Sequence, residues 1–224
     1  MNGTSKSGAG GGSAKGELVL PDGSKIEFEG TLEYGKKDKA LTGAARTAIE
    51  SWEKKRVTNK VEYGYAVDAN GNPIGKEIRG GKGSVRTPIA YNDTPGGTFT
   101  HIHPRGDGML GGTFSTADLT IFSMRRGQTK RAAAKEGTYS ISKGKNFDAA
   151  GFRDYVYQVN AQFNNNYRGK ANALAKDYRA GKIDYKAYLQ SNAKAFNSAL
   201  VQLHNDYSAG QKKYGYTYTL EKNN

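Results

Sequence analysis

Two histidines one residue apart, His101 and His103, are the residues of this sequence best suited to chemistry. The residues before them, 98–100, are β-prone, and side chains two positions apart in a strand point to the same face. Two imidazoles on one face at the end of a strand provide half of a tetrahedral metal site. Asp118, three residues after Ser115, can supply a third ligand and leave a fourth position for water.

Each of these residues also has an ordinary structural interpretation. The histidine pair could consist of hydrogen-bonded strand residues, but it holds two of the three histidines in the chain, just before a proline, which favours metal binding. Ser115 and Asp118 fit a helix N-terminal cap with an acid in the first turn. A cap can also face a metal, so the two interpretations are compatible. His204 is interpreted as a surface or packing residue.

A metal-bound water needs a carboxylate that is not itself a ligand to move its proton. Glu62 is the first candidate, because an expected strand continues from it through residues 63–67. Glu77 on the next expected strand is the second candidate, since the register of strands is not fixed by the sequence. Asp107 competes with Asp118 as the third metal ligand. We favour Asp118 because it lies at the start of an expected helix.

Composition limits the classes of chemistry. The 224 residues contain no cysteine, which excludes disulfides, thiolate zinc sites and cysteine nucleophiles. The formal net charge of +13 suggests contact with phosphate or another polyanion. A basic run after the expected site helix is a candidate docking patch for nucleic acid or an acidic partner, with a solvated face as the alternative. This patch comprises Arg125, Arg126, Lys130, Arg131 and Lys135.

The domain organisation is expected to be simple. Residues 1–16 are rich in Gly and Ser, lack the apolar segment of a secretory signal and predict a flexible tail. Residues 17–224 predict a single domain. No apolar run approaches the roughly 20 residues that span a bilayer, so no membrane partner is expected.

The spacing of apolar residues predicts the elements that position the histidines. Helices are expected over 39–56 and 115–124, and a helical hairpin over about 147–213 is inserted before a last strand at 214–221. The other expected strands are short and separated by turns. They cover residues 17–20, 25–29, 61–67, 74–79, 84–87, 98–103 and 137–142.

The order of these elements resembles the JAB/MPN metalloprotease family, which carries the JAMM motif, and in particular its prokaryotic and phage-borne members. The resemblance spans about residues 61–142 and rests on a strand with a glutamate, then His-x-His-Pro, then Ser-x-x-Asp opening a helix. It implies an α+β fold, sandwich-like, with a mixed sheet flanked by helices and a core over about 40–143 plus the last strand. It also implies roles for five residues: Zn²⁺ ligands at His101, His103 and Asp118, a proton-moving base at Glu62, and an oxyanion helper at Ser115.

One departure from the family is the connection between His103 and Asp118, which holds fourteen residues and is glycine-rich. Lengthening a loop costs little free energy, about 0.6 kcal/mol for each doubling of the number of loop residues.

The implied function is a zinc-dependent peptidase or isopeptidase with a peptide or protein substrate, in the cytoplasm or in a virion. Two alternatives stay open. One is an inactive scaffold or interaction protein of a phage virion, secretion or toxin system, and the other is a basic metal-dependent hydrolase of nucleic acid.

Overall fold

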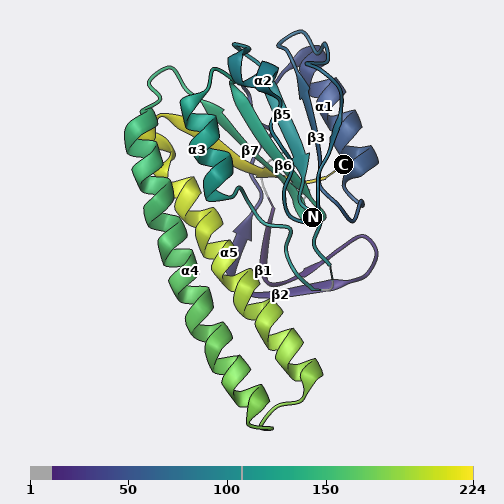
Figure 1. Ribbon diagram of the computed structural model, residues 1–224, viewed down its shortest axis with the longest axis vertical. Helices are drawn as coiled ribbons and strands as arrows, with labels where there is room; N and C mark the ends of the chain where they lie inside the picture. The colour runs from purple at the N-terminus through teal and green to yellow at the C-terminus, as the bar shows by residue number, and fades with distance from the viewer. Residues whose placement is uncertain (1–11, 107, 224) are drawn as a thin grey trace, which may run out of the picture.

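The computed structural model describes residues 12–106 and 108–223. Its centre is a six-stranded mixed sheet in the order β4-β3-β5-β6-β7-β8, in which only the β5–β6 pair is parallel (Figure 1). The strands are β3 (Tyr63–Val67), β4 (Ile78–Arg79), β5 (Thr98–Ile102), β6 (Thr129–Ala134), β7 (Gly137–Lys143) and β8 (Tyr216–Glu221). The strand that carries the histidines therefore lies inside the sheet, where both of its edges are paired.

Helices cover both faces of this sheet (Figure 1). The helix α1 (Gly43–Arg56) packs on one face through Ala45 and Ile49, which join Leu41 and Val67 in a small core. The larger core on the other face is formed with α3 (Thr116–Met124), α4 (Ala149–Arg179) and α5 (Tyr185–Tyr214). A short helix, α2 (Ile89–Asp93), precedes β5. Among the described residues, no helix is both long and apolar enough to cross a membrane.

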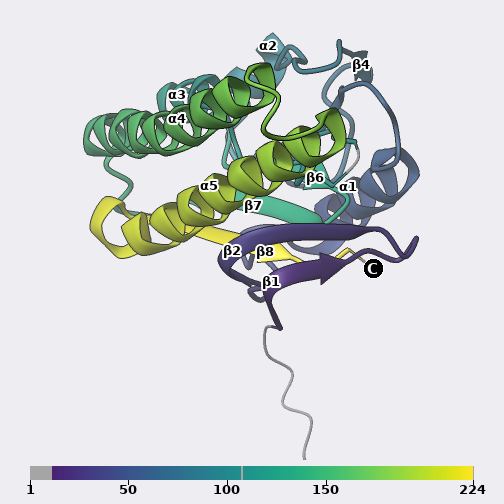
Figure 2. The same cartoon turned by 90° about the horizontal axis from the view of Figure 1, so that it is seen from below.

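The first two strands form a separate hairpin against α5. They are β1 (Ser13–Val19) and β2 (Lys25–Glu33), and Figure 2 shows them below the sheet and beside α5. Ile26, Phe28 and Leu32 of β2 are buried in the larger core. The predicted tail over 1–16 is therefore wrong for residues 13–16, which belong to β1. Residues 1–11 of that prediction lie outside the described part of the chain.

The helical hairpin of α4 and α5 runs alongside the sheet and projects well beyond it (Figure 1). Apolar residues near one end of each helix are buried against the sheet, and Gly215 in the left-handed region (φ 69°) ends α5 and starts β8. The prediction of a hairpin followed by a last strand that joins the sheet is confirmed, as is the α+β class.

Two predicted strands differ from the structure, and one strand of the sheet was not predicted. The predicted strand over 74–79 is reduced to the two residues of β4, and residues 84–87 form no strand. The strand β6, in contrast, was predicted as part of a basic surface run. Its sequence Thr-Lys-Arg-Ala-Ala-Ala contains two charges and no run of β-branched residues, so its strand character comes from pairing on both sides rather than from local propensity.

Candidate metal centre

The three predicted ligands converge at the end of β5. His101 is the last residue but one of that strand, and His103 follows the strand on the same face. The Nε2 atoms of His101 and His103 are 2.8 Å apart, and His101 Nε2 is 3.6 Å from Asp118 Oδ2. One ligand atom from each of the three residues lies within 4.8 Å of the others. The predicted grouping is present in the structure.

Asp118 is positioned by the first turn of α3. Ser115 is the N-cap residue, and its Oγ accepts a hydrogen bond from the backbone N–H of Asp118 at 3.1 Å. The Asp118 Oδ2 atom accepts in return from the Ser115 N–H at 3.0 Å and from the Ser115 hydroxyl at 2.6 Å. This capping box holds the carboxylate beside the histidines. The cap and the ligand interpretations of this segment therefore describe the same side chains.

The long connection between His103 and Asp118, residues 104–117, contributes to the site. The His103 Nδ1–H donates to the carbonyl oxygen of Gly112 at 2.9 Å, which leaves a lone pair on Nε2, the nitrogen that faces His101. Burial and the neighbouring His101 lower the pKa of His103 to about 4, so its ring is neutral at pH 7. A neutral imidazole with its second nitrogen anchored to a carbonyl is the usual form of a metal ligand.

Two buried side chains hold this connection in place. The carboxylate of Glu136 accepts from the N–H groups of Gly111 and Gly112, both at 3.0 Å. From the other side, Asn197 of α5 accepts from the N–H of Leu110 at 2.9 Å and donates to the carbonyl of Gly108 at 2.6 Å. The connection is thus clamped between the turn that joins β6 to β7 and the helix α5. The rival ligand Asp107 lies outside the described residues.

Glu62 lies directly before β3 and lines the same cleft as His103 and Asp118. Its side chain is buried, and burial raises its pKa, while the nearby His101 acts in the opposite direction. The second candidate base, Glu77, lies elsewhere: it accepts hydrogen bonds from Arg56 and Trp52 of α1. Of the two glutamates, only Glu62 is placed beside the histidines.

A buried lysine, which the sequence analysis assigned to the basic patch rather than to the metal site, pairs with Asp118. Lys130 of β6 is only 1 % exposed, and its Nζ lies 2.7 Å from Asp118 Oδ1. It also lies 5.4 Å from the ring centre of Phe99. Burial alone would raise the pKa of Asp118, but Lys130 and His101 hold it well below its usual range. Asp118 is therefore a carboxylate with one oxygen paired to an ammonium group.

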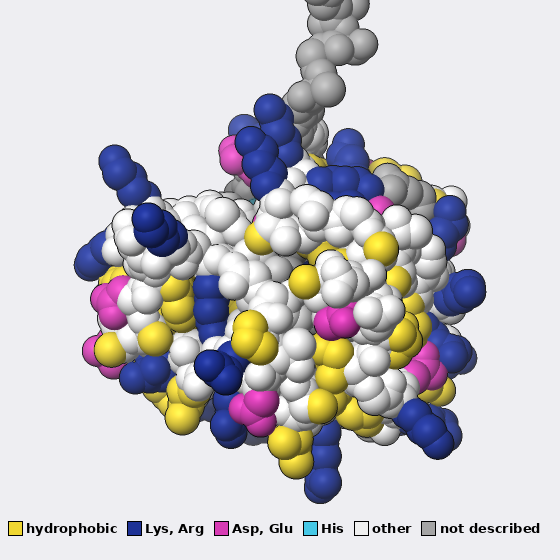
Figure 3. All heavy atoms as spheres, turned by 90° about the horizontal axis from the view of Figure 1, so that it is seen from above, with side chains coloured by type: hydrophobic (Ala, Val, Ile, Leu, Met, Phe, Trp, Pro, Cys, Tyr) yellow, Lys and Arg dark blue, Asp and Glu magenta, His cyan; other side chains and the backbone are white. Residues whose placement is uncertain are grey.

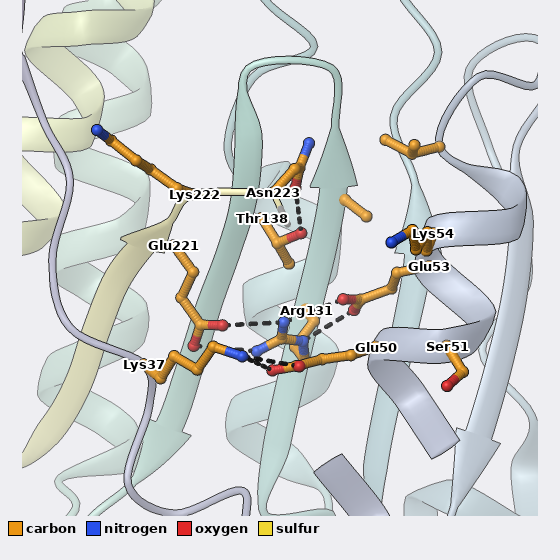
Figure 4. A pocket seen from close by; sticks show the side chains of 12 residues that line it. Lys37, Glu50, Ser51, Glu53, Lys54, Arg131, Thr138, Glu221, Lys222 and Asn223 are labelled. Carbon is orange, nitrogen blue, oxygen red and sulfur yellow. Dashed lines mark hydrogen bonds and ion pairs between the residues drawn. The ribbon is translucent and has the colours of Figure 1, made fainter. Parts of the chain in front are cut away.

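The predicted basic patch does not exist as one surface. Lys130 and Arg131 are consecutive residues of a central strand and point to opposite faces of the sheet. Arg131 is buried and donates to Glu53 and Glu221, as Figure 4 shows. The other members, Arg125, Arg126 and Lys135, are exposed. The prediction was wrong for the two strand residues because buried acids neutralise their charges.

A cleft of about 750 Å³ opens next to the histidines. Glu62, His103 and Asp118 line it, together with residues from the connection after β5 and from α3, α4 and α5. Substrate could therefore approach the candidate metal site from this side.

Comparison of the chain with protein-family models, with curated proteins and with solved structures finds no match. The resemblance to JAB/MPN proteins therefore rests on the motif residues alone.

Proposed function

We propose that this protein is a zinc-dependent peptidase or isopeptidase of the JAB/MPN type. The observation that carries the proposal is the convergence of His101, His103 and Asp118 beside an accessible cleft. Two imidazoles and a carboxylate are a ligand set that suits zinc and leaves an open coordination position. A zinc ion held there would supply a Lewis acid and lower the pKa of a bound water to about 7.

The protein's own residues have distinct duties in this proposal. Glu62 accepts the proton of the attacking water and returns it to the leaving amine, a task that a raised pKa favours because it brings the carboxyl closer to neutral pH. Ser115 fixes Asp118 through its hydroxyl while no substrate is bound. With substrate present, the same hydroxyl donates to the developing oxyanion of the scissile amide.

Metal analysis of the purified protein after stringent dialysis tests the proposal. We expect one zinc per chain in the wild type and in Glu62→Gln, and loss of zinc in His103→Ala and Asp118→Ala. Cleavage of a peptide library should disappear in Glu62→Gln although its zinc is retained. His204→Phe serves as a matched control, since this histidine lies among Tyr139 and Tyr218 rather than in the site. A folded wild type without stoichiometric metal would overturn the proposal.

A second candidate function is a metal-free scaffold of the same fold. It is favoured by one contact, because the ammonium group of Lys130 already provides Asp118 with a positive partner. In that case the Asp118–Lys130 pair holds α3 against β6 without any ion. The wild type would then bind no zinc, and its thermal unfolding would be unchanged by zinc or by a chelator.

A further inference from the structure

Four basic side chains line the cleft next to the candidate metal site. Lys82 and Arg86 come from the segment between β4 and α2, Arg105 follows β5, and Arg125 follows α3. All four are exposed. Within the described part of the chain, none of them forms a salt bridge or a side-chain hydrogen bond with an acid. Their charges are therefore available to a molecule that enters the cleft.

The acids of the cleft are less exposed than its cations. Among the described residues that line it, the acidic ones are Glu62 and Asp118, which are buried or mostly buried and belong to the candidate centre. The four exposed basic residues therefore form a cationic rim, while Glu62 and Asp118 flank the position beside the histidines where the scissile bond would lie. Figure 3 shows a face of the molecule on which lysines and arginines predominate over acids, in line with the net charge of +13.

The wall formed by the helical hairpin is mostly apolar. Phe163 of α4 and Phe196 of α5 are partly exposed in the cleft, with the buried Leu200 and Leu203 behind them, and Asn160 and Asn164 of α4 add two amides to the same wall. Arg105 connects the two kinds of surface, because its guanidinium carbon lies 5.4 Å from the ring centre of Phe196. An apolar side chain placed against these residues would be withdrawn from water, which is favourable in proportion to the buried area.

We propose that the cleft binds an extended peptide segment that has acidic residues on both sides of a large apolar residue. This inference rests on the proposed function, since it names the substrate class of the same site. Acidic side chains of the peptide pair with the rim cations, which come from three separate segments of the chain. The apolar side chain packs on the hairpin wall, and the backbone between them passes the histidines.

A nucleic acid would match this surface less well. Its phosphates could contact the basic rim, but it has no aliphatic side chain to pack on the mostly apolar wall. A phosphodiester at the reacting position would also bring its negative charge close to the carboxyl group of Glu62, which has no cationic partner of its own among the described residues. An amide is uncharged and meets no such repulsion.

Binding to the full-length Glu62→Gln protein tests the inference, because this variant holds substrate without cleaving it. The probe is a fluorescent peptide with glutamates flanking a central Leu-Gly bond, followed by anisotropy at low salt. Reference peptides carry glutamine for glutamate, or glycine for leucine. Arg86→Gln with Arg105→Gln in the same background should weaken binding about tenfold, given the usual strength of exposed charge pairs. The matched control is Lys55→Gln with Lys60→Gln, two exposed lysines outside the cleft, and it should leave binding unchanged.

The outcomes separate the inference from its alternatives. The inference is supported if both reference peptides bind more weakly than the probe and if the Arg86→Gln, Arg105→Gln protein, but not the control protein, binds the probe more weakly. An equal loss of probe affinity in the Lys55, Lys60 control would mean that binding depends on net charge, and this would overturn the inference. Tighter binding of a single-stranded oligonucleotide of equal charge would overturn it in favour of nucleic acid. Selective peptide binding by a protein that holds no zinc would sustain the docking inference while the proposed catalysis fails.

Discussion

Lys130 Nζ lies 2.7 Å from Asp118 Oδ1 in the interior of the protein, where the lysine is 1 % exposed. A buried ion pair contributes little net stability, but removal of one partner leaves the other charged and uncompensated. The pair also leaves only Asp118 Oδ2 turned toward His101. Lys130 therefore sets how many oxygens of Asp118 a metal can reach and supplies a counter-charge when none is bound.

Lys130→Met should lower the stability of the metal-free protein by about 3 kcal/mol, because the Asp118 carboxylate loses its buried partner. Zinc would then take over as the counter-charge. The increase in melting temperature on zinc addition should consequently be larger in Lys130→Met than in the wild type. Thermal unfolding with zinc and with a chelator measures both effects. Lys130→Arg keeps the charge and should respond to zinc as the wild type does; an identical response in Lys130→Met would contradict the role assigned to the lysine.

Glu136→Gln should weaken zinc binding although the residue touches no metal ligand. A glutamine cannot accept equally from Gly111 and Gly112, so the carbonyl that orients His103 loses its support. Loss of such an outer partner usually costs about 10-fold to 100-fold in metal affinity. Tyr139→Phe removes only the third hydrogen bond to the same carboxylate, at 3.1 Å, and serves as the control. Competition titration with a zinc chelator measures the affinities, and equal values for the two variants would rule out the clamp.

The ligand set of the candidate site could be predicted because the pattern of strand and helix fixes it locally. Alternation along β5 places His101 and His103 on one face, and the cap at Ser115 places Asp118 at the start of α3. The supporting contacts were not predictable. Glu136 and Asn197 reach the connection after His103 from the β6–β7 turn and from α5, and their partners lie 24 and 87 residues away along the chain. No local pattern encodes such contacts.

The charged residues of β6 explain the main error in the predicted fold. Lys130 and Arg131 suggest a solvated segment when only the sequence is considered, and the three alanines after them carry no strand signal. The tertiary fold brings Asp118 to one face of the strand and Glu53 and Glu221 to the other. Burial of both basic residues therefore depends on partners from three distant elements, whose positions are known only from the folded structure.

Arg131→Met should destabilise the protein strongly. Its guanidinium donates to Glu53 at 2.8 and 3.0 Å and to Glu221 at 3.1 Å, and all three side chains are buried. Without it, two buried carboxylates face each other, at a cost of about 3–5 kcal/mol. In a chain of this length that corresponds to a decrease of about 10 °C in melting temperature. Arg125→Met, an exposed member of the same predicted patch, should change stability by less than about 0.5 kcal/mol. Calorimetry of both variants decides, and similar melting temperatures would contradict the structural role of Arg131.

His204 should make the stability of the protein sensitive to mild acid. It is buried between Tyr139 and Tyr218, and burial lowers its pKa from 6.5 to about 4. Above pH 6.5 the ring is neutral in both the folded and the unfolded chain, so its full contribution to stability is present. As the pH falls from 6.5 toward 4, only the unfolded chain binds the proton, and stability decreases by about 1.4 kcal/mol per pH unit.

His204→Phe isolates this effect, because a phenyl ring does not titrate, and the lost hydrogen bond between His204 Nδ1 and the Tyr218 hydroxyl (3.0 Å) lowers the stability of the variant at both pH values. Other groups, including His103, also respond to pH, and they do so equally in both proteins. Between pH 7 and pH 5, the wild type should therefore lose about 2 kcal/mol more than the variant, which follows from 1.5 pH units below the unfolded pKa. Urea unfolding at the two pH values measures this difference. An equal loss in both proteins would mean that His204 is protonated as readily in the folded chain as in the unfolded one.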